Sequence, residues 1–94
     1  MARSSWVVTV ETAGTAVQGP STGPGVFLIG TDPANTGYIY IGNDGEDDVA
    51  STTGHKLSAD KQTIVTVSNM NEIWFDASVN GEKATILRVE AYGG

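Results

Sequence analysis

Short runs of β-branched and aromatic residues alternate along this chain with glycine, proline and asparagine, and this pattern argues against helices. No window of about a dozen residues keeps apolar side chains at helical spacing without a glycine, proline or β-branched run intervening. Such runs are typical of β-strands. They cover residues 6–11, 26–29, 38–41, 63–67, 72–76 and 84–90. Several short strands separated by turns predict an all-β fold, a small antiparallel β-sandwich or barrel.

The segments between these runs have recognisable turn chemistry. Asp32-Pro33-Ala34-Asn35-Thr36-Gly37 and Gly42-Asn43-Asp44-Gly45 combine residues that favour turns. Asn80-Gly81 is the sharpest signal, because both residues tolerate the positive φ angles of a tight β-turn. It predicts a hairpin that joins the runs at 72–76 and 84–90.

The N-terminal quarter of the chain is predicted to lie apart from the rest. The run at 6–11 has an apolar residue at every second position, which is the period of a half-buried strand. These positions are Trp6, Val8 and Val10. Residues 12–25 are rich in glycine, proline, threonine and serine, a composition typical of linkers. We therefore expect an extended N-terminal arm and linker over 1–25 and a single β domain over 26–94.

The length of the chain limits its core. A domain of 94 residues buries only about 60–65% of the surface that its unfolded chain exposes. The chain contains no cysteine, so neither disulfides nor thiolate metal sites add stability. A partner surface or a symmetric oligomer would supply some of what the core lacks.

The charge of the chain is strongly negative. Five lysines and arginines stand against eleven aspartates and glutamates, for a net charge of −6. This balance opposes binding to nucleic acids and to anionic membranes, and it favours solubility or docking on a basic surface. The first residues lack the apolar run of a signal peptide, and no stretch approaches the ~20 apolar residues of a membrane span. We expect synthesis as a soluble protein in the cytoplasm.

Catalytic chemistry is not indicated by the residues that could carry it. The sole histidine, His55, lies in a polar stretch with no motif around it. Glu72 and Asp76 lie four residues apart on one predicted strand, some 13 Å at ~3.3 Å per residue, which exceeds the usual separation of glycosidase carboxylates. We expect no enzymatic activity and no cofactor. The acidic run at 44–48 lacks the spacing of an EF-hand, so a solvated loop is favoured over a cation site.

Aromatic residues are the remaining candidates for contacts. On their predicted strands Tyr38, Tyr40 and Trp74 face away from the neighbouring isoleucines and Phe75. One of the two sets must point outward or into a second layer. Three readings are open for the aromatic set: a subunit interface, core packing, or a sugar-binding face.

Much of the body resembles a family of small structural proteins of tailed bacteriophages. The resemblance lies in the segments 35–43 and 71–82 and in Thr53-Gly54, and the similar region covers roughly three quarters of the chain. Proteins of this family are capsid decoration, cement or head-fibre proteins. The resemblance implies a virion protein that binds the major capsid protein on the assembled shell as a homo-oligomer, with a trimer favoured. The arm lies outside the resembling region.

On this reading the N-terminal arm makes the attachment. Its strand would add to the sheet of a neighbouring subunit, and many copies on one shell would gain avidity. The expected contact residues are Trp6, Val8, Val10, Tyr38, Tyr40 and Trp74. The alternative is a receptor- or carbohydrate-binding module of a phage fibre or tail, with Trp74, Tyr38 and Tyr40 stacking on sugar rings.

Overall fold

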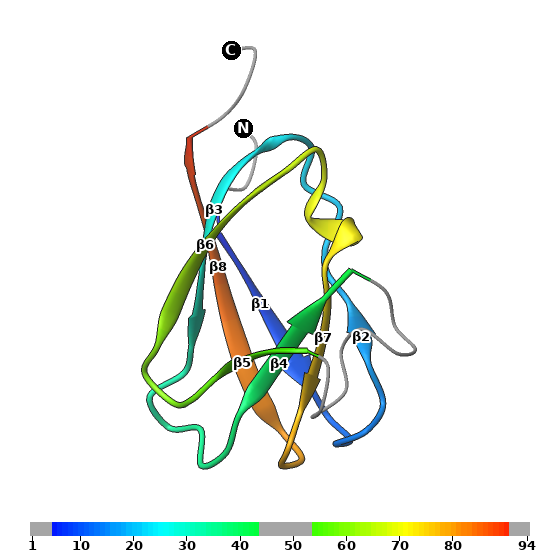
Figure 1. Ribbon diagram of the computed structural model, residues 1–94, viewed down its shortest axis with the longest axis vertical. Helices are drawn as coiled ribbons and strands as arrows, with labels where there is room; N and C mark the ends of the chain where they lie inside the picture. The colour runs from blue at the N-terminus through cyan, green and yellow to red at the C-terminus, as the bar shows by residue number, and fades with distance from the viewer. Residues whose placement is uncertain (1–4, 44–53, 91–94) are drawn as a thin grey trace.

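The computed structural model describes residues 5–43 and 54–90, which form two four-stranded antiparallel sheets packed against each other (Figure 1). Sheet A has the strand order β1-β8-β3-β6, and sheet B has the order β2-β7-β4-β5. The predicted all-β sandwich is confirmed. The strands are β1 (Ser5–Val10), β2 (Val17–Gln18), β3 (Gly25–Thr31), β4 (Ile39–Gly42), β5 (His55–Leu57), β6 (Gln62–Val67), β7 (Trp74–Ala77) and β8 (Glu82–Glu90), with a short 3₁₀ turn, η1 (Met70–Glu72).

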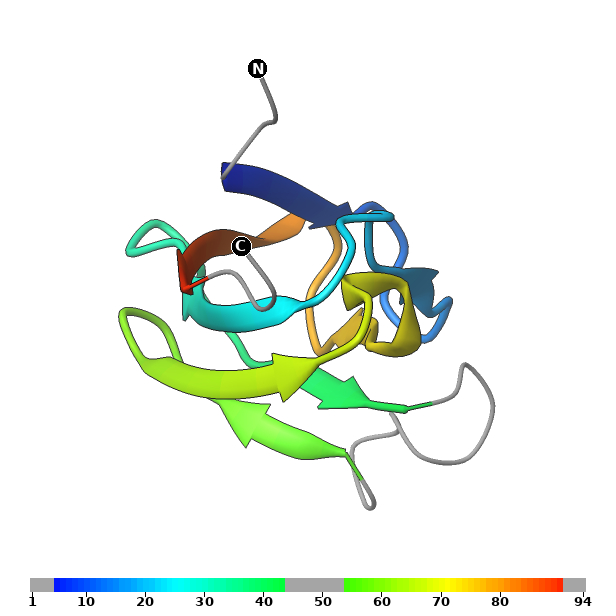
Figure 2. The same cartoon turned by 90° about the horizontal axis from the view of Figure 1, so that it is seen from above.

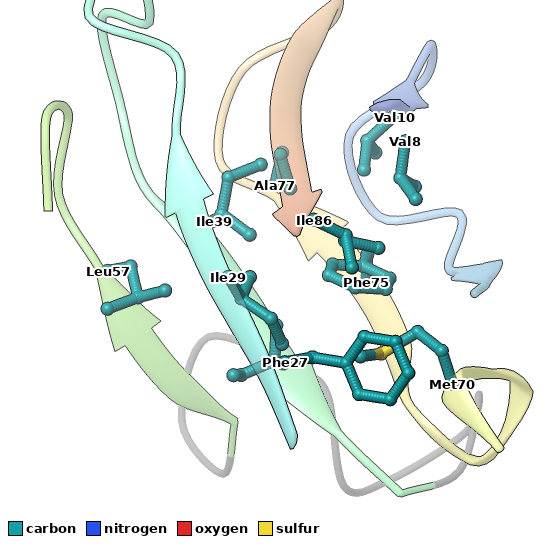
Figure 3. Close-up of a cluster of buried hydrophobic side chains, with 12 residues drawn as sticks. Val8, Val10, Phe27, Ile29, Ile39, Leu57, Met70, Phe75, Ala77 and Ile86 are labelled. Atoms are coloured by element: carbon teal, nitrogen blue, oxygen red, sulfur yellow. The ribbon is translucent and has the colours of Figure 1, made fainter. Parts of the chain in front are cut away.

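The core lies between the two sheets (Figure 3). Every second residue of the central strands points into it, so that Phe27 and Ile29 of β3 face Phe75 of β7 and Ile39 of β4 across the sandwich. All four side chains are fully buried. Burying a side chain of this size stabilises the fold by about 1.5–3 kcal/mol relative to leaving it in water. The period-two pattern in the sequence therefore selects the face that each strand buries.

The expected extended arm is not what the structure shows for residues 5–10. These residues form β1, which pairs with β8 along its whole length. Val10 is fully buried and Val8 is 6% exposed, and both side chains lie in the core beside Ile86 (Figure 3). The alternation identified the strand correctly. β1 lies beside β8 because the inward-facing residues of β8 need a neighbouring strand to cover them.

The expected linker is also part of the packed body. Within it, β2 pairs with β7, and the Gly19 N–H donates a hydrogen bond of 2.8 Å to the carbonyl oxygen of Ile73. A Cβ atom on Gly19 would lie 2.5 Å from the carbonyl oxygen of Met70 and 3.0 Å from that of Ile73. Glycine is required here because the two backbones approach too closely for any side chain.

Gly19→Ala is therefore expected to destabilise the protein by about 3 kcal/mol, because backbone atoms have to move to admit the methyl group. In a free linker the same change would be neutral or slightly stabilising, since alanine restricts the unfolded chain. Urea unfolding measures the difference. Thr12→Ala, at an exposed position of the same segment, is the control and is expected to change little. Equal stability of the two variants would contradict the packing of this segment.

The hairpin predicted at Asn80-Gly81 is wrong. The turn exists, and Gly81 has a φ of +81°, but β7 lies in sheet B whereas β8 lies in sheet A. The connection crosses between the layers, and the Gly81 N–H donates to the carbonyl oxygen of Val10. Most connections between the described strands behave in the same way: of those that follow one another in the chain, only β4 and β5 share a sheet. Turn residues therefore predict where the chain reverses its direction, but they do not predict which strands pair with each other.

Candidate functional site

The outer face of sheet A carries a row of apolar side chains that crosses all four strands. This apolar row consists of Val7 (β1), Leu87 (β8), Leu28 (β3) and Ile64 (β6). Leu28 lies directly opposite both Leu87 and Ile64 in the neighbouring strands. Val7 lies opposite Thr85, two residues from Leu87. The exposed fraction is 62% for Val7, 64% for Ile64 and 45% for Leu87. Contiguous exposed apolar residues of this kind mark sites of interaction.

The described side chains of the same face are almost free of charge. Of its described outward positions only Lys83 is charged, although the whole chain carries a net charge of −6. The outward positions are Ser5, Val7, Thr9, Val26, Leu28, Gly30, Gln62, Ile64, Thr66, Lys83, Thr85, Leu87 and Val89. A neutral, apolar face accepts another protein surface without leaving buried charges unpaired.

A hollow of about 600 Å³ lies beside the apolar row. Gly30 forms part of its lining, and Leu28, Leu87, Thr85 and Gln62 stand around it. The side chains that line it include no acid, base or thiol. A hollow with this lining can receive an apolar side chain of a partner.

The aromatic candidates on sheet B are less accessible than expected. Tyr40 is only 6% exposed, and Trp74 is half-buried. Tyr38 is 43% exposed, its ring stacks on that of Tyr40 with centroids 6.5 Å apart, and the Lys56 Nζ lies 5.1 Å from the Tyr38 centroid. Of the three aromatic rings, Tyr38 alone offers a substantial surface to a partner.

The candidate residues of β1 contact the core of their own chain. Val8 and Val10 are buried, so they have no surface to offer. Trp6 packs on Phe27, with ring centroids 6.1 Å apart. The Arg88 guanidinium lies over both rings, at 5.8 Å from the Trp6 centroid and 5.4 Å from that of Phe27. Trp6 thus packs within the sandwich and is half-buried beneath a cation.

The titratable candidates have structural partners or lie exposed. His55 is exposed at the start of β5. Glu72 lies in η1 and not in β7, and its carboxylate accepts a hydrogen bond from the Ser68 hydroxyl. Asp76 is buried and accepts from the Gly14 N–H at 2.9 Å.

Three further features bear on ligands and membranes. In 5–43 and 54–90, no cluster of three or more histidine, cysteine or acidic side chains is placed to hold a metal ion. The acidic run at 44–48 lies outside the described residues. The described part of the chain has no helix that is long and apolar enough to cross a membrane.

Segments 35–43 and 71–82 meet at a buried carboxylate. Glu82 is 5% exposed and accepts hydrogen bonds from the backbone N–H groups of Thr36 and Gly37, at 3.2 and 2.6 Å. Beside it, the Asn35 amide exchanges two hydrogen bonds with the backbone of Lys83, at 2.9 and 3.0 Å. These residues hold the connection between β3 and β4 against the start of β8. Their role is to fix the fold.

Sequence reasoning missed the apolar row, although the sequence contains a signal for it. A strand of a sandwich with one solvated face alternates apolar and polar residues, whereas each of these strands carries two consecutive large apolar residues. The pairs are Val7-Val8, Leu28-Ile29, Ile64-Val65 and Ile86-Leu87. One member of each pair fills the core, so the other has to lie on the outer face.

Comparison with protein families, with curated proteins and with solved structures finds no match for this chain.

Proposed function

We propose that this chain is a non-enzymatic structural protein that attaches to an assembled protein shell, as a capsid decoration or cement protein of a bacteriophage. The observation that carries the proposal is the neutral apolar row on the outer face of sheet A. The resemblance of segments 35–43 and 71–82 to phage decoration proteins supports the choice of shell. Docking by this face replaces docking by a free arm, because β1 already belongs to sheet A.

The size of the row is compatible with weak binding by each copy. Full burial of an exposed valine, leucine or isoleucine is worth about 1.5–3 kcal/mol, and these side chains are already partly buried, so each adds about 1 kcal/mol. Four such gains only match the lower end of the roughly 4 kcal/mol or more that association costs. A single copy therefore binds weakly, and a repeating shell holds many copies by avidity if they are joined to one another.

Quantitative mass spectrometry of purified particles tests the proposal. Particles of the phage whose genome encodes this chain are expected to carry on the order of hundreds of copies, as a repeating shell requires. Absence of the chain from particles overturns the proposal. A few copies confined to the tail also overturn it and favour the receptor- or carbohydrate-binding alternative.

A matched pair of variants locates the attachment face. Leu87→Asp places a charge within the apolar row and is expected to lower occupancy on particles that lack the chain by about tenfold or more. Val79→Asp is the control, because Val79 is 39% exposed but lies in the connection between β7 and β8, away from the row. Equal occupancy of the two variants would show that another surface makes the contact.

The carbohydrate-binding alternative has less support from the side chains. It needs a platform of exposed rings, whereas Tyr40 is buried beneath its neighbours and Trp74 is half-buried. Tyr38 with Lys56 beside it is a small polar-aromatic surface. One exposed ring is a weaker basis for sugar stacking than the apolar row is for protein docking.

A further inference from the structure

Both edges of sheet A are open in the described part of the chain. β1 pairs with β8 on one side, and β6 pairs with β3 on one side. Figure 2 shows β1 and β6 at opposite ends of the sheet. Each strand therefore presents a second edge of backbone N–H and C=O groups that no described strand occupies. Such edges are templates for pairing with another chain.

Neither edge carries the features that usually prevent such pairing. β1 and β6 are six residues long, and neither contains a charged residue or a proline. Their pairing with β8 and β3 runs without a register shift. The sequences, SWVVTV and QTIVTV, are rich in β-branched residues on both faces. Monomeric proteins usually protect edges of this length with lysine, proline or a bulge.

The two sides of the sandwich also leave core residues partly uncovered. On the β1 side these are Trp6 and Val17, and on the β6 side they are Val65, Val67 and Ile73. The β6 side also has a hollow of about 300 Å³, whose lining includes Val65, Ile73 and His55. A neighbour placed at either side would cover inward-facing apolar side chains as well as the strand edge.

The two edges match each other in direction and in the alternation of their side chains. Sheet A is antiparallel throughout, so β1 and β6 run in opposite directions, and β1 of a second copy can continue the sheet beyond β6 as an antiparallel strand. The alternation of the two strands also matches, because Trp6 and Val65 face inward whereas Val7 and Ile64 face outward. The occupant that fits the β6 edge is therefore a second copy of this chain.

We propose that β1 of one copy pairs with β6 of a second copy, with Val7 opposite Ile64, so that sheet A continues from chain to chain. In this register Trp6 lies opposite Val65, and every inward residue faces an inward residue. The apolar rows of the two copies also join through Val7 and Ile64. The inference rests on the proposed assembly role, because it names the contact that links copies on a shell.

Such a contact is heterologous, since each copy uses two different edges. Repetition of one rotation then closes a ring or extends a filament. A ring of three copies is the trimer that the phage resemblance implies. Linked copies would present several apolar rows to one shell, which supplies the avidity that a single weak face lacks.

A disulfide test on the purified chain detects the pairing directly, because the chain contains no cysteine. In the variant Val7→Cys/Ile64→Cys, the two positions lie on the outer strands of one sheet, three strand spacings or about 14 Å apart within a copy. This exceeds the ~7 Å that a disulfide spans between Cα atoms, whereas opposed residues of paired antiparallel strands lie about 4.5–5.5 Å apart. Mild oxidation at high protein concentration is expected to give covalent trimers or longer ladders on a non-reducing gel.

The control is Val7→Cys/Thr66→Cys, in which the second position also faces outward on β6 but lies one step out of register. The two diagonal positions would be about 7–8 Å apart, so cross-linking is expected to fall about tenfold. Equal cross-linking of both variants, or none with either, overturns the proposed pairing. Dimers from Val7→Cys alone that match the double variant would show β1-to-β1 pairing and also overturn it.

Charged variants test the contact without cysteines. Val7→Lys/Ile64→Lys changes two side chains that are more than 60% exposed, so the fold is expected to survive, as circular dichroism would show. In sedimentation velocity the wild type is expected to form larger species as its concentration rises, and the variant to lose them. Persistence of these species in the folded variant contradicts the pairing. If these tests fail, single copies can still attach to particles. If the chain is absent from particles, the pairing of copies can still hold. The attachment and the pairing are therefore tested separately.

Discussion

Val10→Asp is expected to unfold the protein, whereas Val7→Asp, in the same strand, is expected to leave it folded. Val10 is fully buried in the core, and Val7 is 62% exposed on the outer face. A carboxylate at position 10 would lose its hydration without gaining a partner, and the core would lose a well-packed side chain, at a combined cost of more than about 4 kcal/mol. Most or all of the stability of a small domain, about 5–10 kcal/mol, would then be lost.

Thermal unfolding followed by circular dichroism measures this difference. A cooperative transition is expected for the wild type and for Val7→Asp, and its absence is expected for Val10→Asp. If residues 5–10 were an extended arm, both variants would unfold at the wild-type temperature.

The same reasoning changes how attachment has to be tested. Deletion of residues 1–25 removes β1 and β2, so a loss of binding would report unfolding and not the loss of a docking arm.

The strands themselves could be predicted from the sequence because side-chain alternation reports directly on burial. The observed β1, β6 and β8 match the predicted runs at 6–11, 63–67 and 84–90 to within about two residues. Their pairing could not be predicted, since alternation states which face is buried but not which strand lies alongside. Asn80-Gly81 shows the limit, because the same turn chemistry serves a hairpin and a crossing between sheets.

The candidate site was harder to predict because contact surfaces and cores draw on the same residue types. Tyr40 is an expected contact residue because it faces away from the neighbouring isoleucines, yet it is 6% exposed. Val8 is also an expected contact residue but fills the core, whereas Val7 beside it is exposed. Glycine and proline in 12–25 predict an extended linker, whereas Gly19 is required by close backbone contact. Composition does not distinguish a flexible glycine from a packed one.

Glu82→Ala is expected to destabilise the protein by about 4 kcal/mol. The substitution leaves the N–H groups of Thr36 and Gly37 without their carboxylate acceptor, and each unsatisfied partly buried donor costs about 1–3 kcal/mol. It also leaves a space beside Gly37, where the Glu82 Oε1 lies 3.4 Å from the position of a Cβ atom. Urea unfolding gives the change in the free energy of unfolding. Glu11→Ala, at an exposed position just after β1, is the control and is expected to lie within about 0.5 kcal/mol of the wild type.

Glu82→Gln separates the charge of this side chain from its shape. Glutamine keeps the volume and one oxygen acceptor, so we expect a smaller loss of about 2 kcal/mol. If both Glu82 variants were as stable as the wild type, the carboxylate would not hold the turn. In that case the presence of Glu82 in segment 71–82, next to Thr36 and Gly37, would call for a functional reason. If both variants lose stability in the expected order, the residues of segments 35–43 and 71–82 are explained by their role in stabilising the fold. The case for attachment to a shell then depends on the apolar row and on the edges of sheet A, which are the surfaces that the particle and cross-linking experiments probe.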